Sequence, residues 1–106
     1  MSALKLIFSH ADPVYTPAQP RPASTGLFAF NVTQVSSSGS PSLVVTVQHK
    51  DSNDSTWGNH TDFAAVTTAG AVAPLSCANL KEQIRLKLVM GGTNAWERIF
   101  ITPPTA

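Results

Sequence analysis

The sequence predicts an all-β protein, folded as an antiparallel β-sandwich or jelly roll with an extended proline-rich arm near its N-terminus. Short runs rich in β-branched and aromatic residues alternate with clusters of Gly, Pro, Ser and Asn, which is typical of strands joined by turns. No stretch keeps an amphipathic helical period for more than about two turns. We therefore expect about seven or eight short strands in a single domain spanning residues 1–106.

The N-terminal part of the chain contains two predicted strands with the arm between them. Residues 4–8 are predicted to form a short strand and residues 27–35 a longer one, because both are rich in large apolar residues. Between them, residues 11–26 contain four prolines. Proline lacks a backbone donor and biases its predecessor toward extended geometry, so this segment is predicted to be neither helix nor central strand.

The C-terminal part is predicted to consist of further strands and loops. Residues 43–50 and 62–67 should be strands, 69–74 an edge or a loop, and 75–80 a short extended piece. Alternation is clearest in residues 84–90, where Ile84, Leu86, Leu88 and Met90 should face the core. Residues 91–94 predict a hairpin turn, with 95–101 as the partner strand and 102–106 as a tail outside it. The pairing within this hairpin is open, with Glu97 opposite either Lys87 or Leu88.

Composition excludes several functions. Charged residues are 12% of the chain, against about 25% in ordinary domains, while hydrophobic residues are 42% and the net charge is +1. The chain therefore lacks the basic stripe of a nucleic-acid binder. No apolar run is long enough for a signal peptide or a membrane helix, so we expect synthesis in a cytoplasm and no membrane partner. Part of the surface is expected to face another protein instead of water.

The candidate chemical motifs are weak. Asp51, Asn53, Ser55, Asn59 and Asp62 have the spacing of an EF-hand loop, but its glycine position is Thr56 and its last position is not Glu, so an ordinary polar loop is favoured. His10, His49 and His60 lack zinc-site spacing. The lone Cys77 is expected to be a small buried side chain. With no nucleophile motif and no carboxylate pair, we expect no enzyme activity, no catalytic residues, no cofactor and no metal.

Two segments resemble small virion proteins of tailed bacteriophages. Residues 42–57, SLVVTVQHKDSNDSTW, show a strand that ends in Val-Gln-His and runs into a polar loop closed by an aromatic residue. Residues 80–88, LKEQIRLKL, carry an Ile-Arg-Leu strand core before a Gly-rich turn. The resemblance implies a small β-sandwich or jelly-roll component of a virion. Such proteins are often capsid decoration or cement proteins that form trimers, and sometimes parts of the neck or tail.

We therefore expect a non-enzymatic virion protein that binds across neighbouring capsid subunits as a homo-oligomer, with the major capsid protein or another virion protein as its partner. The arm would then be a strap between subunits, and bulky residues of the last hairpin would add apolar contact surface. The candidate interface residues are Pro13, Tyr15, Pro17, Pro20, Arg21, Pro22, Phe28, Phe30, Trp96 and Phe100.

Two alternatives remain open. A fibronectin-like or carbohydrate-binding module would use Trp57, Tyr15 or Trp96 as a flat platform on which a sugar stacks. A small metal-dependent enzyme would need bound metal after purification.

Overall fold

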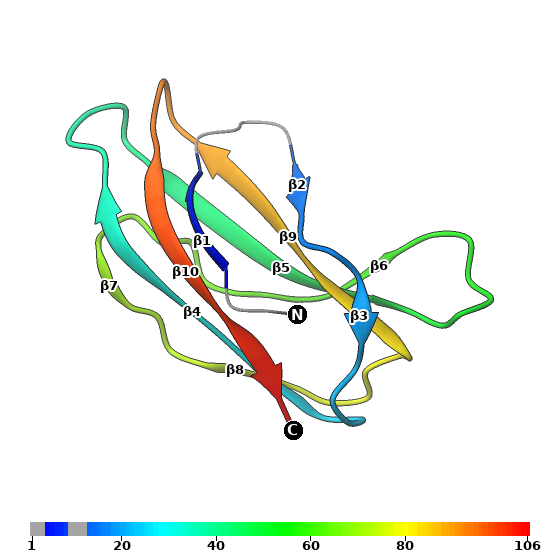
Figure 1. Cartoon of the computed structure of the whole chain (residues 1–106). Helices are drawn as coiled ribbons and strands as arrows, with labels where there is room; N and C mark the ends of the chain where they lie inside the picture. Colours follow the sequence, from blue (N-terminus) through cyan, green and yellow to red (C-terminus); the bar gives the residue numbers. More distant parts are fainter. Residues whose placement is uncertain (1–3, 9–12) are drawn as a thin grey trace.

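Strands are the regular elements of this chain. The computed structural model describes residues 4–8, by their backbone, and residues 13–106. These residues contain no helix and form two antiparallel sheets, which confirms the all-β prediction (Figure 1). Consequently, no helix in the described part of the chain could cross a membrane. The strands of the described residues are β1 Leu4–Phe8, β2 Val14–Tyr15, β3 Gln19–Pro20, β4 Gly26–Val35, β5 Ser42–Lys50, β6 Gly58–Asp62, β7 Gly70–Ala71, β8 Leu75–Cys77, β9 Gln83–Gly91 and β10 Glu97–Thr105.

The chain passes back and forth between the two sheets. The first, here called the β4–β10 sheet, has the order β1-β10-β4-β7, with β8 also paired to β4. The second, the β5–β9 sheet, has the order β2-β9-β5-β6, with β3 also paired to β9. Two consecutive strands share a sheet only at β2 and β3, β5 and β6, and β7 and β8. The long strands therefore find their partners far away in the sequence.

Both sheets contribute to one hydrophobic core. Strand β9 alternates as predicted, with Ile84, Leu86, Leu88 and Met90 buried. Strand β5 buries Leu43, Val45 and Val47 toward the same core. Strand β4 buries Phe28, Phe30 and Val32 in the same way. Cys77 is 1% exposed and packs in this core as a small apolar residue, as predicted. The apolar members of the cluster are Phe28, Phe30, Val32, Leu43, Val45, Val47, Phe63, Cys77, Leu80, Ile84, Leu86, Leu88, Met90, Ala95, Ile99 and Ile101.

The predicted final hairpin is wrong. Strand β9 lies in the β5–β9 sheet and β10 in the β4–β10 sheet, so residues 92–96 connect the sheets (Figure 1). Glu97 accordingly lies opposite Val35 of β4, and neither Lys87 nor Leu88 is its partner. The turn chemistry was nonetheless recognised, because Gly92 and Asn94 both have positive φ. A turn signal reports that the chain reverses but does not say which strand it then pairs with.

The strand predicted at residues 62–67 begins earlier and is polar. Strand β6 pairs with β5 at the edge of its sheet. Just beyond it, Phe63 still donates its backbone N–H to Val45 O at 2.9 Å, and its ring packs edge-to-face on Phe30 with centroids 4.9 Å apart. Val66 makes a single isolated bridge to Leu43. The apolar character of this segment thus reflects core filling by an irregular connection between the two sheets.

The predicted C-terminal tail is also strand. β10 continues to Thr105, through Pro103 and Pro104. The ladder with β4 shifts register between Thr102 and Thr105, and β1 pairs only as far as Ile101. The two prolines therefore occupy positions at which no ladder hydrogen bond from their nitrogens is required.

Candidate partner-binding face

The outer face of the β5–β9 sheet carries a row of polar side chains. Since alternate residues of a strand point to opposite faces, the burial of Leu86 and Val47 places their neighbours on the outside. Register then sets Arg85 opposite Gln48 and Lys87 opposite Thr46. We call this surface the Arg85 face, made of Tyr15, Thr46, Gln48, Lys50, Trp57, Asn59, Asp62, Arg85 and Lys87.

Arg85 is the centre of this face. Its guanidinium carbon lies 3.9 Å from the ring centroid of Tyr15 and 4.4 Å from that of Trp57. Its Nε donates to Oε1 of Gln48 at 2.8 Å. A guanidinium over an aromatic face is attracted by the ring quadrupole. The two aromatic residues come from the proline-rich segment and from the loop after β5, so three distant parts of the chain meet at one cation.

Hydrogen bonds continue from Arg85 across the sheet. Gln48 donates from Nε2 to Oδ1 of Asn59 at 2.8 Å, and Thr46 donates from its hydroxyl to Oδ1 of Asp62 at 2.7 Å. Thr46 and Gln48 are buried although their positions face outward, because their neighbours cover them. Networks of satisfied polar groups hold their members in place. The Arg85 face is therefore ordered before any partner binds.

Positive charge dominates the Arg85 face. Lys50 lies 5.4 Å from the Trp57 ring centroid, and Lys87 occupies the outward position next to Arg85 along β9. Within the described residues, the sole ion pair joins Lys81 to Asp54, so Arg85 has no carboxylate partner there. Desolvation by its neighbours lowers the pKa of the Arg85 guanidinium, as burial does for any cation without a paired anion.

The residues with EF-hand-like spacing, for which an ordinary polar loop was favoured, do not gather their oxygens at one point. Asp51 Oδ1 accepts from the backbone of Glu82 at 3.3 Å, and Glu82 Oε1 accepts from the backbone of Ser52 at 2.9 Å. Asn59 and Asp62 instead belong to the hydrogen-bonded rows of the Arg85 face. No group of three His, Cys, Asp or Glu side chains in the described residues could hold a metal ion. The two carboxylates join the loop to the start of β9.

Two of the three histidines meet at this end of the sheet, while His10 lies outside the described residues. The rings of His49 and His60 are 4.9 Å apart and nearly perpendicular. His49 Nδ1 accepts from the backbone of Lys81 at 3.2 Å, and His60 Nε2 lies 2.6 Å from the Ala78 carbonyl. Desolvation, with help from His60 and Lys81, lowers the pKa of His49. Both rings thus bind backbone groups of the connection before β9.

The arm residues pack on their own chain. Residues 11 and 12 of the predicted arm lie outside the described part, but β2 and β3 pair with β9 of the same chain. Thr16 donates to Leu86 O at 2.9 Å, Arg21 donates its backbone N–H to Glu82 O at 2.9 Å, and the Arg21 guanidinium donates to Leu80 O. Over its described residues, the arm lies along β9 of its own chain and leaves Pro13, Pro17, Pro20, Arg21 and Pro22 exposed. A strap between subunits stays a prediction.

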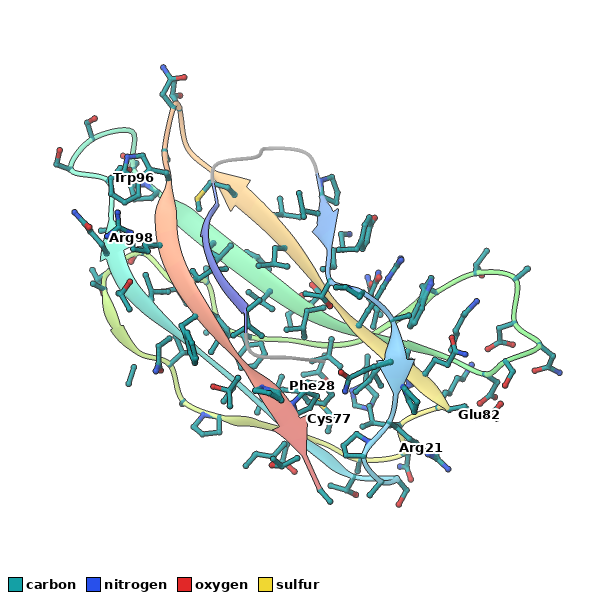
Figure 2. All side chains as sticks on the ribbon, viewed as in Figure 1. Arg21, Phe28, Cys77, Glu82, Trp96 and Arg98 are labelled. Carbon is teal, nitrogen blue, oxygen red and sulfur yellow. The ribbon has the colours of Figure 1, made fainter. Side chains whose placement is uncertain are left out.

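The predicted aromatic anchors fall into three places. Phe28 and Phe30 are each 1% exposed in the core, so neither offers surface to a partner, and this correction removes both from the anchor set. Trp96 and Phe100 are half-buried at β10. Figure 2 shows Trp96 and Arg98 where β10 begins, with Arg21 and Glu82 at the opposite end. Tyr15 is 45% exposed on the Arg85 face. Phe28 and Phe30 are two residues apart on β4 and share one face, and this face packs in the core.

Two further features, a surface hollow and the Cys77 thiol, do not form a catalytic site among the described residues. A hollow of about 400 Å³ is lined entirely by residues 62–75, most of them small and uncharged. Burial raises the pKa of the Cys77 thiol, which keeps it protonated and poorly nucleophilic near neutral pH. Neither feature brings a nucleophile together with a base.

Sequence reasoning missed the central residue of the face. Arg85 and Lys87 were recognised only as the polar half of an alternating strand. Arg85 and Lys87 point outward from β9, and Thr46 and Gln48 point outward from β5. Considered together, these four positions could have predicted one polar sheet face. Nothing local could have placed Tyr15 over Arg85, since that contact depends on how the proline-rich segment docks. In comparisons with known proteins, the chain matched no protein-family model, no curated protein and no solved structure.

Proposed function

We propose that this chain is a non-enzymatic structural protein of a phage virion, a capsid decoration or cement protein that binds across neighbouring capsid subunits as a small oligomer. Besides the sequence resemblance, one structural observation supports this proposal: the order of the strands in the two sheets. If β2 with β3, and β7 with β8, each count as one interrupted strand, ten strands become eight. Their order is then first-eighth-third-sixth in one sheet and second-seventh-fourth-fifth in the other.

We infer from this order that the two sheets form a jelly roll. Two interlocked Greek keys of four strands characterise that architecture, which is found in viral capsid and lectin domains. A jelly roll alone does not define a function. The virion assignment therefore also depends on the resemblance of residues 42–57 and 80–88 to small phage proteins.

The surface supports an assembly role. With 12% charged residues the chain has little of the charge that keeps free domains apart in solution. The aromatic anchors that retain exposed surface lie on both sheets, at Tyr15 and Trp57 on one and at Trp96 and Phe100 on the other. Many weak copies bound to a symmetric lattice gain avidity without a tight single site. The other virion locations, at the head–tail junction or in the tail, fit the same surface.

A carbohydrate-binding module is the second candidate, because Tyr15 and Trp57 do lie on the same face. Lectin domains also use jelly rolls. However, the Arg85 guanidinium occupies the space over both rings, and Trp96 belongs to the other sheet. A flat platform for sugar stacking is therefore less available here than the sequence alone predicts.

The decisive experiment examines particles of the phage whose genome encodes the chain. We expect mass spectrometry of purified virions to find the chain in a fixed ratio to the major capsid protein. Shells from a deletion strain should bind the purified protein and release their DNA at a higher temperature afterwards. Light scattering should give the mass of three chains for the free or released protein. Absence of the chain from purified virions would overturn the proposal.

A further inference from the structure

We propose that the Arg85 face docks an acidic, carboxylate-bearing segment of a partner protein. For the identity of that partner the inference rests on the proposed function, which makes it a capsid subunit. The surface itself is defined by its own contacts. Three of its features lead to this occupant: the kinds of residue at its centre, the order already present there, and its unbalanced charge.

The centre of the face consists of the residues that dominate binding energies. Tyr, Trp and Arg are the three types most enriched among interface hot spots. Here Tyr15, Arg85 and Trp57 form one continuous stack, with guanidinium-to-ring distances of 3.9 and 4.4 Å. A stack of this kind presents a large contact area with few freely rotating bonds.

The stack is held in its binding geometry before a partner arrives. Arg85 is fixed by two rings and by Gln48, which is itself hydrogen-bonded to Asn59. Ordering a long side chain on binding costs conformational entropy. That cost is already met inside the folded chain, so a ligand of Arg85 gains more from each contact.

Charge determines the chemistry of the occupant. Of the guanidinium nitrogens, Nε bonds Gln48, and no carboxylate of the described residues pairs with the group. Lys50 and Lys87 add two positive charges, while the carboxylate on this face, Asp62, accepts from Thr46. Nearby Asp54 pairs with Lys81. A carboxylate accepts a bidentate bond from guanidinium, so an acidic segment completes the face.

The same observations disfavour other occupants. Nucleic acid requires many cations along a groove, and the whole chain has a net charge of +1. A neutral saccharide needs a free aromatic face, and the Arg85 guanidinium lies over both the Tyr15 ring and the Trp57 ring. An acidic peptide pairs its carboxylate with the Arg85 guanidinium and leaves the contacts of that group with Tyr15 and Trp57 in place.

The test compares two arginine substitutions that remove the same charge. Arg85→Gln removes it from the Arg85 face, and Arg98→Gln removes it from an exposed position of the β4–β10 sheet. Both variants are titrated onto capsid shells from the deletion strain in 50 and 300 mM salt. We expect Arg85→Gln to weaken binding at least about tenfold and to reduce its salt dependence, whereas Arg98→Gln stays within about twofold of the unsubstituted chain. Free poly-glutamate should compete for the shells.

A second pair of variants keeps the proposal testable if Arg85→Gln does not fold stably. Lys87→Glu reverses a charge next to Arg85, at the position opposite Tyr15 in the β2–β9 pair, and keeps all three residues of the stack. Arg98→Glu is its matched control. If Arg85→Gln melts far below the unsubstituted chain, the Lys87→Glu pair carries the test, with at least tenfold weakening expected.

The outcomes separate the two proposals. If the unsubstituted chain binds shells and the Arg85 and Lys87 variants bind equally well, the Arg85 face is not the docking surface, although the virion role stands. Competition by neutral oligosaccharides, with none by poly-glutamate, would replace the acidic segment with a glycan. If the unsubstituted chain binds no shells and is absent from virions, the proposed function itself fails.

Discussion

Thr16 uses its side chain to make a bond that a strand ordinarily makes with its backbone. Its N–H donates to Leu86 O at 2.9 Å, and the Leu86 N–H donates back to the Thr16 hydroxyl, also at 2.9 Å. In a regular antiparallel pair the second acceptor would be the carbonyl of Thr16. The β2–β9 ladder ends before Pro17 and pairing resumes only at β3, so the hydroxyl holds the proline-rich segment to β9 between these two strands.

Substitution of Thr16 tests that role. Thr16→Val keeps the shape but leaves the buried Leu86 N–H without an acceptor, so we expect a loss of about 1–3 kcal/mol in unfolding free energy. Thr16→Ser keeps the hydroxyl and should cost less than about 1 kcal/mol. Urea unfolding measures both values. Equal losses for the two variants would mean that the methyl group matters and the hydrogen bond does not.

At the residue scale, the sequence predicts burial better than contact. Alternation correctly placed Ile84, Leu86, Leu88 and Met90 inward, because period two is a property of the strand itself. The same alternation sent Arg85 outward, but its two aromatic partners lie on segments without any period. Such contacts depend on loop docking, which single-sequence patterns do not encode.

At the scale of elements, the positions of strands were predicted better than their partners. The long strands now labelled β4, β5 and β9 were predicted to within a few residues. The pairing of β9 with β10 was wrong, because a Gly-Gly-Thr-Asn sequence fits a hairpin and a crossover between sheets equally well. Strand β6 was misplaced because its stability comes from hydrogen bonds to Gln48 and Thr46 and not from its own propensity.

The crossover after β9 depends on two glycines that approach each other closely. Gly39 and Gly92 have φ of 87° and 100°, and Thr93 donates to Gly39 O at 3.0 Å. A Cβ atom on Gly92 would overlap the carbonyl oxygen of Gly39. The β4–β5 connection and the β9–β10 crossover, which lie at the same end of the molecule in Figure 1, can therefore touch only where side chains are absent.

Alanine at neighbouring glycines tests this crossing. Gly92→Ala adds left-handed strain and a backbone clash, so we expect a loss of about 2 kcal/mol or more in unfolding free energy. Gly91→Ala is the matched control, because its Cβ would lie at an ordinary 3.4 Å from Ser42 O. That variant should cost less than about 1 kcal/mol. Thermal melts of both proteins compare them, and similar melting temperatures would contradict the predicted crossing.

At the scale of the whole molecule, the two ends respond to pH in opposite directions. Glu97 begins β10, is 0% exposed, and has no hydrogen-bond partner for either carboxyl oxygen among the described residues. Desolvation raises its pKa to about 7. Its folded pKa therefore lies above its unfolded value, so the folded state holds the proton more tightly. Its stabilising contribution is complete in acid and is lost as pH rises toward 7.

The opposite end is sensitive to acid. Hydrogen bonds from backbone N–H groups lower the pKa of Asp54 and Glu82, and desolvation lowers that of His49. The contributions of all three groups are present above their unfolded pKa values and are lost as pH falls through the folded ones. Protonated His49 could not accept the Lys81 N–H, so the link between β5 and the start of β9 would break.

Substitution of Glu97 should separate the two responses. The contribution of Glu97 falls as pH rises from about 4.5 to 7, whereas those of Asp54 and Glu82 fall as pH drops below their unfolded pKa values of 3.8 and 4.5, so these carboxyl groups together place the stability maximum at about pH 4.5. Glu97→Gln removes the loss between about pH 4.5 and 7, and should raise the unfolding free energy at pH 8 by up to about 3 kcal/mol. Glu82→Gln, the matched control, should lower the unfolding free energy above about pH 4.5 and flatten the fall in acid, while the fall toward pH 7 stays unchanged. Melting temperatures measured from pH 3 to 9 give both profiles. If Glu97→Gln retains the fall in stability between pH 5 and 8, Glu97 is not its cause, and the buried carboxyl must be accommodated by a neighbour that compensates its charge.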